Sequence, residues 1–257
     1  MWAPARFGSF PLIRRAPGYV PCSEATMRTL AIEQSTGAAG VALLEDTRVL
    51  AEESWMETRG RAGHLFEALP RVLELAGCTV DEIGLFAIGL GPGSFSGLRT
   101  SLSAANHLAL PGLKPVFGVP SAQALARRVM TEEDTDSVAV VGDARRKRLW
   151  YAVFRRRDKA IRPADTFSLI NTNELASALD NPAILVSPDW DRIADVLRET
   201  AGGTRIIAEP RTPSARDVGR LAAMAFDPAR PPAPPEPIYM HPPVFVEPKF
   251  PQRPTSG

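Results

Sequence analysis

A glycine-rich loop at 89–101 has the composition of a phosphate-binding turn. The segment reads GLGPGSFSGLRTS, with three glycines and a proline directly before a helix-forming stretch. Free backbone amides at a helix N-terminus attract anions. Phosphate binding is therefore one hypothesis for this loop.

The loop matches neither common phosphate motif. A P-loop needs GxxxxGK followed by Ser or Thr, but here Gly97 is followed by Leu98 and Arg99. A dinucleotide fingerprint needs a third glycine where Ser96 stands and an acid about 20 residues further on. We therefore favour a structural role, since proline fixes one torsion and glycine permits positive φ. The structural loop comprises Gly91, Pro92, Gly93, Ser94, Gly97 and Arg99.

Two predicted helices, at 64–76 and 95–110, are unusually apolar. Apolar residues cover about half of the first, more than the ~100° stripe of a helix that packs on one side. In the second, apolar residues recur at steps of 3 and 4, as in a coiled-coil seam. The pattern fits either a partner-binding face or core helices enclosed in their own lobe. The candidate partner-binding residues are Leu65, Leu69, Val72, Leu73, Ala76, Phe95, Leu98, Leu102, Ala105 and Ala109.

Catalytic and metal-binding patterns are missing from the sequence. The three histidines, His64, His107 and His241, form no HxxxH or HExxH motif, which a zinc hydrolase would require. Ser94 has no GxSxG context for a nucleophile. We expect no catalytic residue and no metal site.

The bulk composition excludes several classes of protein. The chain has 257 residues, a hydrophobic content of 44% and a formal net charge of +1, so it can bury a core and has no global field for nucleic acid or anionic membranes. No apolar run reaches the roughly 20 residues of a membrane span. The two cysteines form no CxxC pair, which favours a reducing compartment. We expect a cytoplasmic protein.

The chain divides into two lobes between irregular ends. Residues 1–26 show neither helical nor strand periodicity, and we expect an unfolded extension, with Met27 opening the folded chain. From 228 to 257 prolines crowd the sequence and favour extended polyproline. The intervening length suits two lobes of about 100 residues each, at 27–131 and 132–227.

The two lobes begin with the same pattern. A strand at 28–33 ends at an acid, Glu33, and a polar loop leads to a hairpin. A second strand, at 138–142, ends at Asp143 and also leads to a hairpin. We interpret this as an internal duplication and expect partly parallel sheets. Further strands are predicted at 41–44, 49–55, 83–90, 115–119, 149–154, 183–187 and 204–208, and further helices from Ser121 as N-cap and at 172–179, 189–200 and 214–226.

Duplicated units of this kind resemble the actin, sugar-kinase and Hsp70-like ATPases, whose two α/β lobes clamp ATP. Within that superfamily, several segments together resemble the TsaB (YeaZ) family, and the resemblance covers about 27–243. The nine-residue GPGSFSGLR is specific, whereas the other segments are weak alone. The segments are IEQST at 32–36, GPGSFSGLR at 91–99, GVPS at 118–121, DARR at 143–146 and PIYMHPP at 237–243.

The resemblance implies both fold and function. It implies a two-lobe actin/Hsp70-like fold with a reduced second lobe. It also implies a non-catalytic paralogue that partners and activates TsaD, together with TsaE, when threonylcarbamoyl is moved onto the adenosine beside the tRNA anticodon. In the family, the two apolar helices form a bundle with the partner. Without TsaD the chain is expected to form a homodimer, and any contact with tRNA is expected to be indirect.

The resemblance also implies a degenerate nucleotide site. ATPases of the superfamily hold magnesium through an aspartate at the end of the first strand. Here that position is Glu33, followed by Ser35 and Thr36, and its counterpart in the second lobe is Asp143. We expect no tightly bound cofactor and at most weak binding of ATP or ADP. The alternative is an independent nucleotide-binding enzyme, ATPase-like or kinase-like, or a glycoprotease-like peptidase.

A basic hairpin offers a third hypothesis, RNA binding. Arginine and lysine occupy 145–148, and arginine occupies 155–157. One hairpin would bring these side chains together as a patch for phosphates. The other interpretation is a solvated face, because only Trp150 and Tyr151 supply aromatic rings nearby.

Overall fold

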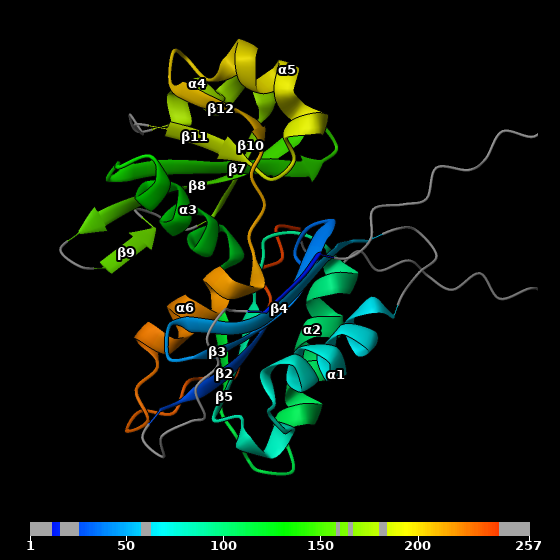
Figure 1. Cartoon of the computed structure of the whole chain (residues 1–257). Helices are drawn as coiled ribbons and strands as arrows, with labels where there is room; N and C mark the ends of the chain where they lie inside the picture. Colours follow the sequence, from blue (N-terminus) through cyan, green and yellow to red (C-terminus); the bar gives the residue numbers. More distant parts are fainter. Residues whose placement is uncertain are drawn as a thin grey trace, which may run out of the picture.

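The chain folds into two α/β lobes placed one above the other (Figure 1). This computed structural model describes residues 12–15, 26–57, 63–157, 160–163, 167–179 and 184–241. None of the helices in these ranges has the length and hydrophobicity that crossing a bilayer demands.

The first lobe is built on a mixed sheet with the strand order β1-β4-β3-β2-β5-β6. Its centre is β2, which is buried along its whole length, because it pairs antiparallel with β3 on one side and parallel with β5 on the other. The strands are β1 (Leu12–Arg15), β2 (Arg28–Glu33), β3 (Ala38–Glu45), β4 (Arg48–Met56), β5 (Leu85–Gly89) and β6 (Val116–Val119).

The second sheet repeats this order with β7 at its centre. It runs β10-β8-β7-β11-β12, with β9 also paired to β8. Strand β7 pairs antiparallel with β8 and parallel with β11, as β2 does with β3 and β5. The predicted duplication and two-lobe fold are confirmed. The strands are β7 (Ser137–Arg145), β8 (Arg148–Arg157), β9 (Ala160–Pro163), β10 (Ser168–Asn171), β11 (Ile184–Ser187) and β12 (Arg205–Pro210).

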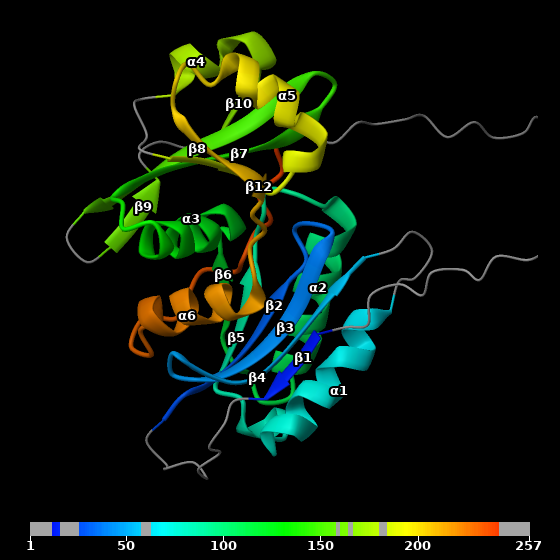
Figure 2. The ribbon, with the colours of Figure 1, turned by 45° about the horizontal axis from the view of Figure 1, so that its top comes forward.

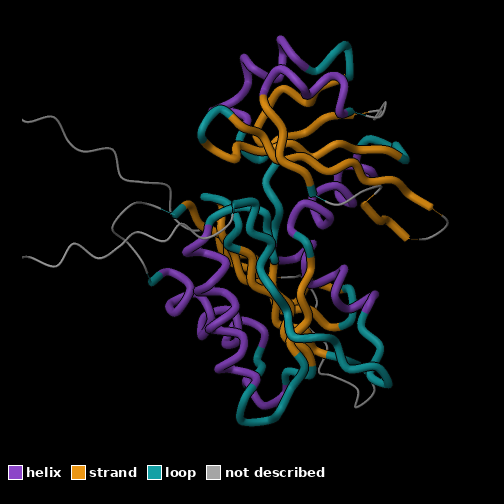
Figure 3. The backbone as a smooth tube through the Cα atoms, turned by 180° about the vertical axis from the view of Figure 1, so that it is seen from behind, coloured by secondary structure: helices purple, strands orange, loops and turns teal. Residues whose placement is uncertain are grey.

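The first-lobe helices α1 (His64–Ala76) and α2 (Phe95–Ala109) cover one face of the first sheet. Both lie on its outer side, also when the molecule is seen from behind in Figure 3. Helix α1 has the predicted bounds and ends at Gly77 with φ 59°, the left-handed C-cap that glycine favours. A short 3-10 turn, Val80–Glu82, follows it.

Helices α3 (Ser121–Glu132) and α6 (Ala215–Ala225) lie between the two sheets (Figure 2). Each packs on the sheet of the other half of the chain: α3 contacts β7, β8 and β9, and α6 contacts β2, β3 and β5. The prediction that 27–131 and 132–227 are separate lobes is therefore wrong at these helices. The apolar stripe of each helix packs on the sheet of the opposite lobe. Gly219 lets α6 approach the β2–β3 face closely.

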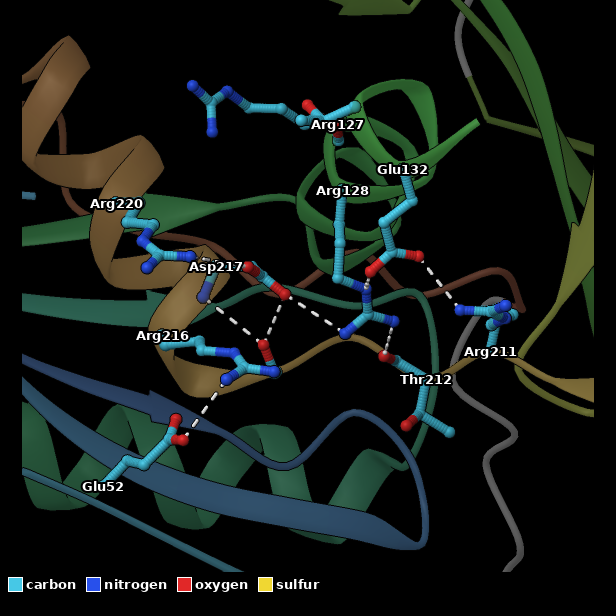
Figure 4. Close-up of polar contacts among 11 residues, drawn as sticks. Glu52, Arg127, Arg128, Glu132, Arg211, Thr212, Arg216, Asp217 and Arg220 are labelled. Atoms are coloured by element: carbon cyan, nitrogen blue, oxygen red, sulfur yellow. Dashed lines mark hydrogen bonds and ion pairs between the residues drawn. The ribbon is translucent and has the colours of Figure 1, made fainter. Parts of the chain in front are cut away.

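Polar contacts fasten α3 to α6 and to the connection that precedes α6 (Figure 4). Arg128 pairs with Asp217 at 3.2 Å and donates to the carbonyl oxygen of Thr212 at 2.8 Å. Asp217 also accepts a hydrogen bond from Ser214, which caps α6. The two lobes are thus joined by buried charge pairing as well as by the chain.

The second lobe carries its remaining helices on its outer face. Helices α4 (Leu175–Ala178) and α5 (Trp190–Thr200) pack on this face, and a 3-10 turn, Thr172–Glu174, precedes α4.

Two features at the chain ends differ from expectation. Strand β1 pairs antiparallel with β4, so the first 26 residues contain one strand where an unfolded extension is predicted; 1–11 and 16–25 lie outside the described residues. The tail is described as far as His241, and 242–257 lie outside. The amide of Ile238 donates to the carbonyl oxygen of Leu90 at 2.8 Å. The proline-rich segment is therefore anchored to the first lobe at Ile238.

Candidate functional site

The glycine loop packs tightly against the end of β2. Gly91 has φ 88°, a left-handed conformation that suits glycine. Gly93 does not adopt a positive φ, and its small size is what matters. An ideal Cβ on Gly93 would lie 1.9 Å from the carbonyl oxygen of Ser35, and one on Gly97 would lie 2.1 Å from that of Gln34. The glycine loop is therefore in close backbone contact with the segment that follows β2.

Helix α2 begins at this junction. Ser94 is its N-cap, and its hydroxyl accepts a hydrogen bond from the Gly97 amide at 3.2 Å, the usual way of satisfying a free donor at a helix start. The Ser94 amide donates to the carbonyl oxygen of Ser35 at 2.7 Å. Ser101, about two turns further on, donates to the Gln34 side chain at 2.9 Å. These bonds fix the direction in which α2 leaves the sheet.

Glu33 is turned into the protein interior. Its side chain is fully buried, and its Oε1 accepts a hydrogen bond from the Ser35 amide at 2.6 Å. The other oxygen lies where a Cβ on Gly89 would be, beside the hydroxyl of Ser121. Burial raises the pKa of the Glu33 carboxyl above its ordinary value, although hydrogen bonds from Ser35 and Ser121 oppose the shift.

Ser121 is the first residue of α3, and Pro120 holds the N-cap position. The predicted N-cap at Ser121 is therefore wrong by one residue. Its hydroxyl instead accepts a hydrogen bond from the Gly91 amide at 2.9 Å. Ser121 thus links the glycine loop to helix α3, which lies between the two sheets.

Asp143 is neutralised by arginines. Its carboxylate lies 3.2 Å from the guanidinium of Arg145 and 3.2 Å from that of Arg192. Its amide donates to Asp189 at 2.8 Å. Burial raises the pKa of Asp189 above its ordinary value. The acids and arginines form one compact network on the second lobe.

A cleft of about 1030 Å³ lies between the segment after β2 in the first lobe and the Asp143 network in the second lobe. Ser35 and Thr36 line its first-lobe wall, and Asp143 lines its second-lobe wall. Glu33 is not among its lining residues. The members of the predicted nucleotide site are therefore only partly brought together.

The superfamily's magnesium does not fit these two acids in the expected way. The acid at the end of the first strand faces the interior next to Gly89 and not the cleft. The acid of the second unit is already paired with two guanidinium groups. Magnesium prefers free carboxylate oxygens and water, which neither acid supplies here.

Most of the predicted partner-binding residues lie inside the first lobe. They pack against the sheet or against the base of the loop, so the prediction that they face a partner is wrong for them: the apolar stripes of α1 and α2 are used by their own core. Leu73 and Leu102 are half-buried, and Phe95 is exposed. The buried residues are Leu65, Leu69, Val72, Ala76, Leu98, Ala105 and Ala109.

The outward side of α2 forms a continuous exposed strip, here called the α2 face. Apart from Arg99 it carries no arginine, lysine or acid. Beyond the helix, Leu113 is 86% exposed. On α1, Phe66 is 62% exposed and lines the cleft together with Phe95. The α2 face consists of Phe95, Ser96, Arg99, Ser103, Asn106, His107 and Leu110.

The basic hairpin is split into two groups. Arg145 pairs with Arg148 in register at the turn, whereas Arg155 pairs with Ser137 at the other end. At about 3.4 Å per residue the two groups are roughly 24 Å apart. Arg156 forms an ion pair with Asp136 at 3.0 Å. The prediction of one basic patch is wrong, because a hairpin separates its turn from its open end.

The histidines have separate surroundings. The ring of His64 lies 6.2 Å from that of Trp55, and His107 contacts the carbonyl oxygen of Ser103 at 2.6 Å. In the described ranges no three His, Cys, Asp or Glu side chains are grouped as metal ligands.

Comparisons with known proteins place this geometry in a family. The protein-family model for TsaD, tRNA N6-adenosine threonylcarbamoyltransferase, matches residues 59–187. The tRNA threonylcarbamoyladenosine biosynthesis protein TsaB of Escherichia coli is 26% identical over 78% of this chain and 87% of its own length. The uncharacterized protein Rv3421c of Mycobacterium tuberculosis is 30% identical over 83% of this chain and 92% of its own length.

This chain belongs to the TsaB (YeaZ) family. A solved structure agrees: an uncharacterized Pseudomonas aeruginosa protein with similarity to the peptidase YeaZ superposes with a TM-score of 0.71. It is 25% identical and covers 84% of this chain and 100% of its own. The TsaB-type fold thus spans both lobes.

Sequence reasoning missed one residue at the site of this TsaB family member. Tyr239, in the docked tail, lies with its ring centroid 5.0 Å from that of Phe95. No periodic pattern marks a residue in a proline-rich segment. The PIYMHPP stretch at 237–243 is the signal that was available, because it belongs to the family resemblance.

Proposed function

We propose that this chain is the non-catalytic partner and activator of a TsaD-type transferase in tRNA threonylcarbamoyladenosine biosynthesis. The single observation that carries the proposal is the α2 face. It presents small polar side chains and Leu110 along a helix whose outer surface has one charged residue, Arg99. Family membership supplies the pathway.

The physical chemistry of the α2 face suits a protein partner. A solvated helix normally carries charged residues on its outer face, whereas 100–113 contain none. Small side chains such as Ser103 let a second helix approach closely, and exposed apolar side chains at both ends add area to bury. A stable interface needs about 800 Å² per partner, so we expect exposed neighbours such as Phe66 on α1 to join α2 in the interface.

A homodimer is the expected state without the partner. An exposed apolar surface favours self-association, and a two-fold axis lets one patch bind its own copy. The same α2 face would then serve both assemblies in turn. Competition between the homodimer and the complex with the TsaD-type protein follows from this arrangement.

The burial of Glu33 argues against the alternative of an independent ATPase. A magnesium-dependent enzyme needs an acid directed at the nucleotide, and Glu33 is fully buried beside Gly89. We propose that any binding of ATP or ADP in the cleft is weak and not part of a reaction of this chain. Contact with tRNA is proposed to be indirect, through the partner.

Reconstitution of the modification tests this function. Cognate TsaD-type and TsaE-type proteins, tRNA and a threonylcarbamoyl donor are incubated with and without this chain, and modified adenosine is measured by mass spectrometry. We expect modification to require the chain and to be lost with Ser103→Arg. Full modification without the chain would contradict the proposal.

A further inference from the structure

Arg99 is the charged residue of the α2 face, and its guanidinium is held from two sides. Its Cζ lies 4.0 Å from the centre of the Phe95 ring. Its Nε donates to the hydroxyl of Tyr239 at 3.4 Å. Within the described part of the chain, no carboxylate lies within 4.0 Å of this guanidinium.

The tail holds Tyr239 firmly in this position. On one side, the Ile238 amide is bonded to Leu90 of the first lobe at 2.8 Å. On the other side, Nε2 of His241 lies 2.6 Å from the carbonyl oxygen of Ala144 in the second lobe. Met240 packs against the second-lobe core. Tyr239 is therefore fixed between two anchored neighbours.

Stacking restricts the guanidinium without neutralising it. One face of the planar group lies on the Phe95 ring, a cation–π contact that limits its rotamers. The terminal N–H groups remain available as a rigid fork, and such a fork matches a carboxylate in a bidentate arrangement. A flexible arginine would lose more side-chain entropy on binding.

The surroundings of Arg99 favour a protein carboxylate over a phosphate. Across the cleft, Arg145 and Arg192 are paired with Asp143, so these two guanidinium groups are less available to a polyphosphate or an RNA backbone. Along α2, the neighbouring exposed residues are uncharged. These uncharged residues offer a polyanion no further ion pairs, whereas a helix of a partner protein can pack against them.

We propose that Arg99, positioned by Phe95 and the tail residue Tyr239, is the anchor that receives a carboxylate of the TsaD-type partner. This rests on the proposed function and adds the docked tail to the partner surface. Arginine is one of the residue types enriched among the hot spots of protein interfaces.

Binding measurements with the intact chain test the anchor. The dissociation constant for the cognate TsaD-type protein is measured by calorimetry for the wild type, Arg99→Gln and Arg99→Lys. We expect Arg99→Gln to weaken binding by about tenfold or more and to reduce its dependence on salt, because one ion pair is lost. Arg99→Lys should fall between them. Thermal melts establish that each variant is folded.

A second pair of variants tests the role of the tail. Tyr239→Ala removes both the ring that supports Phe95, which in turn stacks on Arg99, and the 3.4 Å hydrogen bond to Arg99; Tyr239→Phe keeps the ring and loses only that long hydrogen bond. We expect Tyr239→Ala to weaken binding several-fold and Tyr239→Phe to bind almost as the wild type does. Equal binding by both alanine and phenylalanine variants would overturn the positioning role.

Zero-length crosslinking identifies the group that faces position 99. A carbodiimide joins an amine to a carboxylate, so the amine introduced by Arg99→Lys should be recovered by mass spectrometry attached to an Asp or Glu of the partner. Lys114, close to the end of α2, is the internal control. A crosslink at Lys114 without one at position 99 would overturn the proposal.

The outcomes separate this inference from the proposed function. If the wild type forms no complex, the proposed function fails. If the wild type binds, Ser103→Arg abolishes binding and Arg99→Gln binds within twofold of the wild type, only the anchor is overturned. If Arg99→Gln weakens binding only when tRNA or a nucleotide is present, the guanidinium binds a phosphate. That result would overturn the proposal that it binds a carboxylate of the partner.

Discussion

The carbonyl oxygen of Ser35 lies 1.9 Å from where a Cβ on Gly93 would stand. The glycine loop and the end of β2 are thus in backbone contact. In a phosphate-binding loop that space belongs to the ligand. Here the chain fills it with its own backbone, and α2 is fixed to the sheet as a result.

This contact predicts that Gly93→Ala is destabilising. The carbonyl group of Ser35 leaves the new methyl group no room, so we expect a loss of about 1–3 kcal/mol in the free energy of unfolding, measured with urea. Gly37→Ala is the matched control, because its nearest neighbour is the flexible Met56 side chain at 3.7 Å. Equal stability of both variants would contradict the account of the loop.

Glu33→Gln should stabilise the protein at neutral pH. A carboxyl whose pKa is higher in the folded than in the unfolded chain favours folding when protonated. The destabilisation by ionised Glu33 is therefore absent at a pH below 4.5, the ordinary pKa of the group, and grows as the pH rises above that value. We expect Tm to rise by about 2–4 °C at pH 7.5, with the difference shrinking toward pH 4.5. A lower Tm for the variant at neutral pH would show that the ionised form is needed.

The polar contacts between α3 and α6 predict that Asp217→Asn loosens the packing of these two helices. Arg128 would keep its bond to Thr212 at 2.8 Å and its longer ion pair with Glu132 at 3.7 Å, but lose its closest charged partner. Weakening the pairing of a largely buried guanidinium in this way should cost about 1–3 kcal/mol, seen in urea unfolding. Asp195→Asn, in an exposed pair on α5, should change stability by less than about 0.5 kcal/mol. A similar small effect at Asp217 would contradict the role of the network.

Self-association should depend on the same face as partner binding. Sedimentation velocity over a range of concentrations is expected to show a monomer–dimer equilibrium for the wild type and a monomer for Ser103→Arg. A buried arginine on both copies would bring like charges together without partners. A dimer that persists unchanged in Ser103→Arg would place self-association elsewhere on the chain.

Local patterns in the sequence predict much of the fold. The bounds of α1 follow from its apolar spacing and from Gly77, and the repeat of strand, acid and hairpin at Glu33 and Asp143 predicts the duplication. These features depend on neighbours within a few residues. They are therefore visible in the chain itself.

The partner of each apolar stripe is not predictable from the chain. The stripe on α6 has the same appearance whether it covers the second sheet or, as observed, the first. Leu69 and Val72 on α1 likewise cover their own sheet although they fit an interface equally well. Helical spacing tells which side of a helix is apolar, but only the three-dimensional arrangement decides what covers it.

The candidate site depends on contacts over long sequence distances. Tyr239 reaches Phe95 and Arg99 from a separation of 140 residues or more, and no local rule connects them. The orientation of Glu33 is equally hidden, because an acid at a strand end points either into a cleft or into the core. Sequence reasoning finds these residues but not their directions.

The most direct test of the partner role is size-exclusion chromatography with light scattering on this chain mixed with its cognate TsaD-type protein. The wild type is compared with Ser103→Arg, which places a charge on the α2 face, and with Thr131→Arg, an equivalent change at an exposed position on α3. We predict a mixed complex for the wild type and Thr131→Arg and none for Ser103→Arg. No complex with the wild type, or an undiminished complex with Ser103→Arg, would contradict the central claim that this face binds the partner.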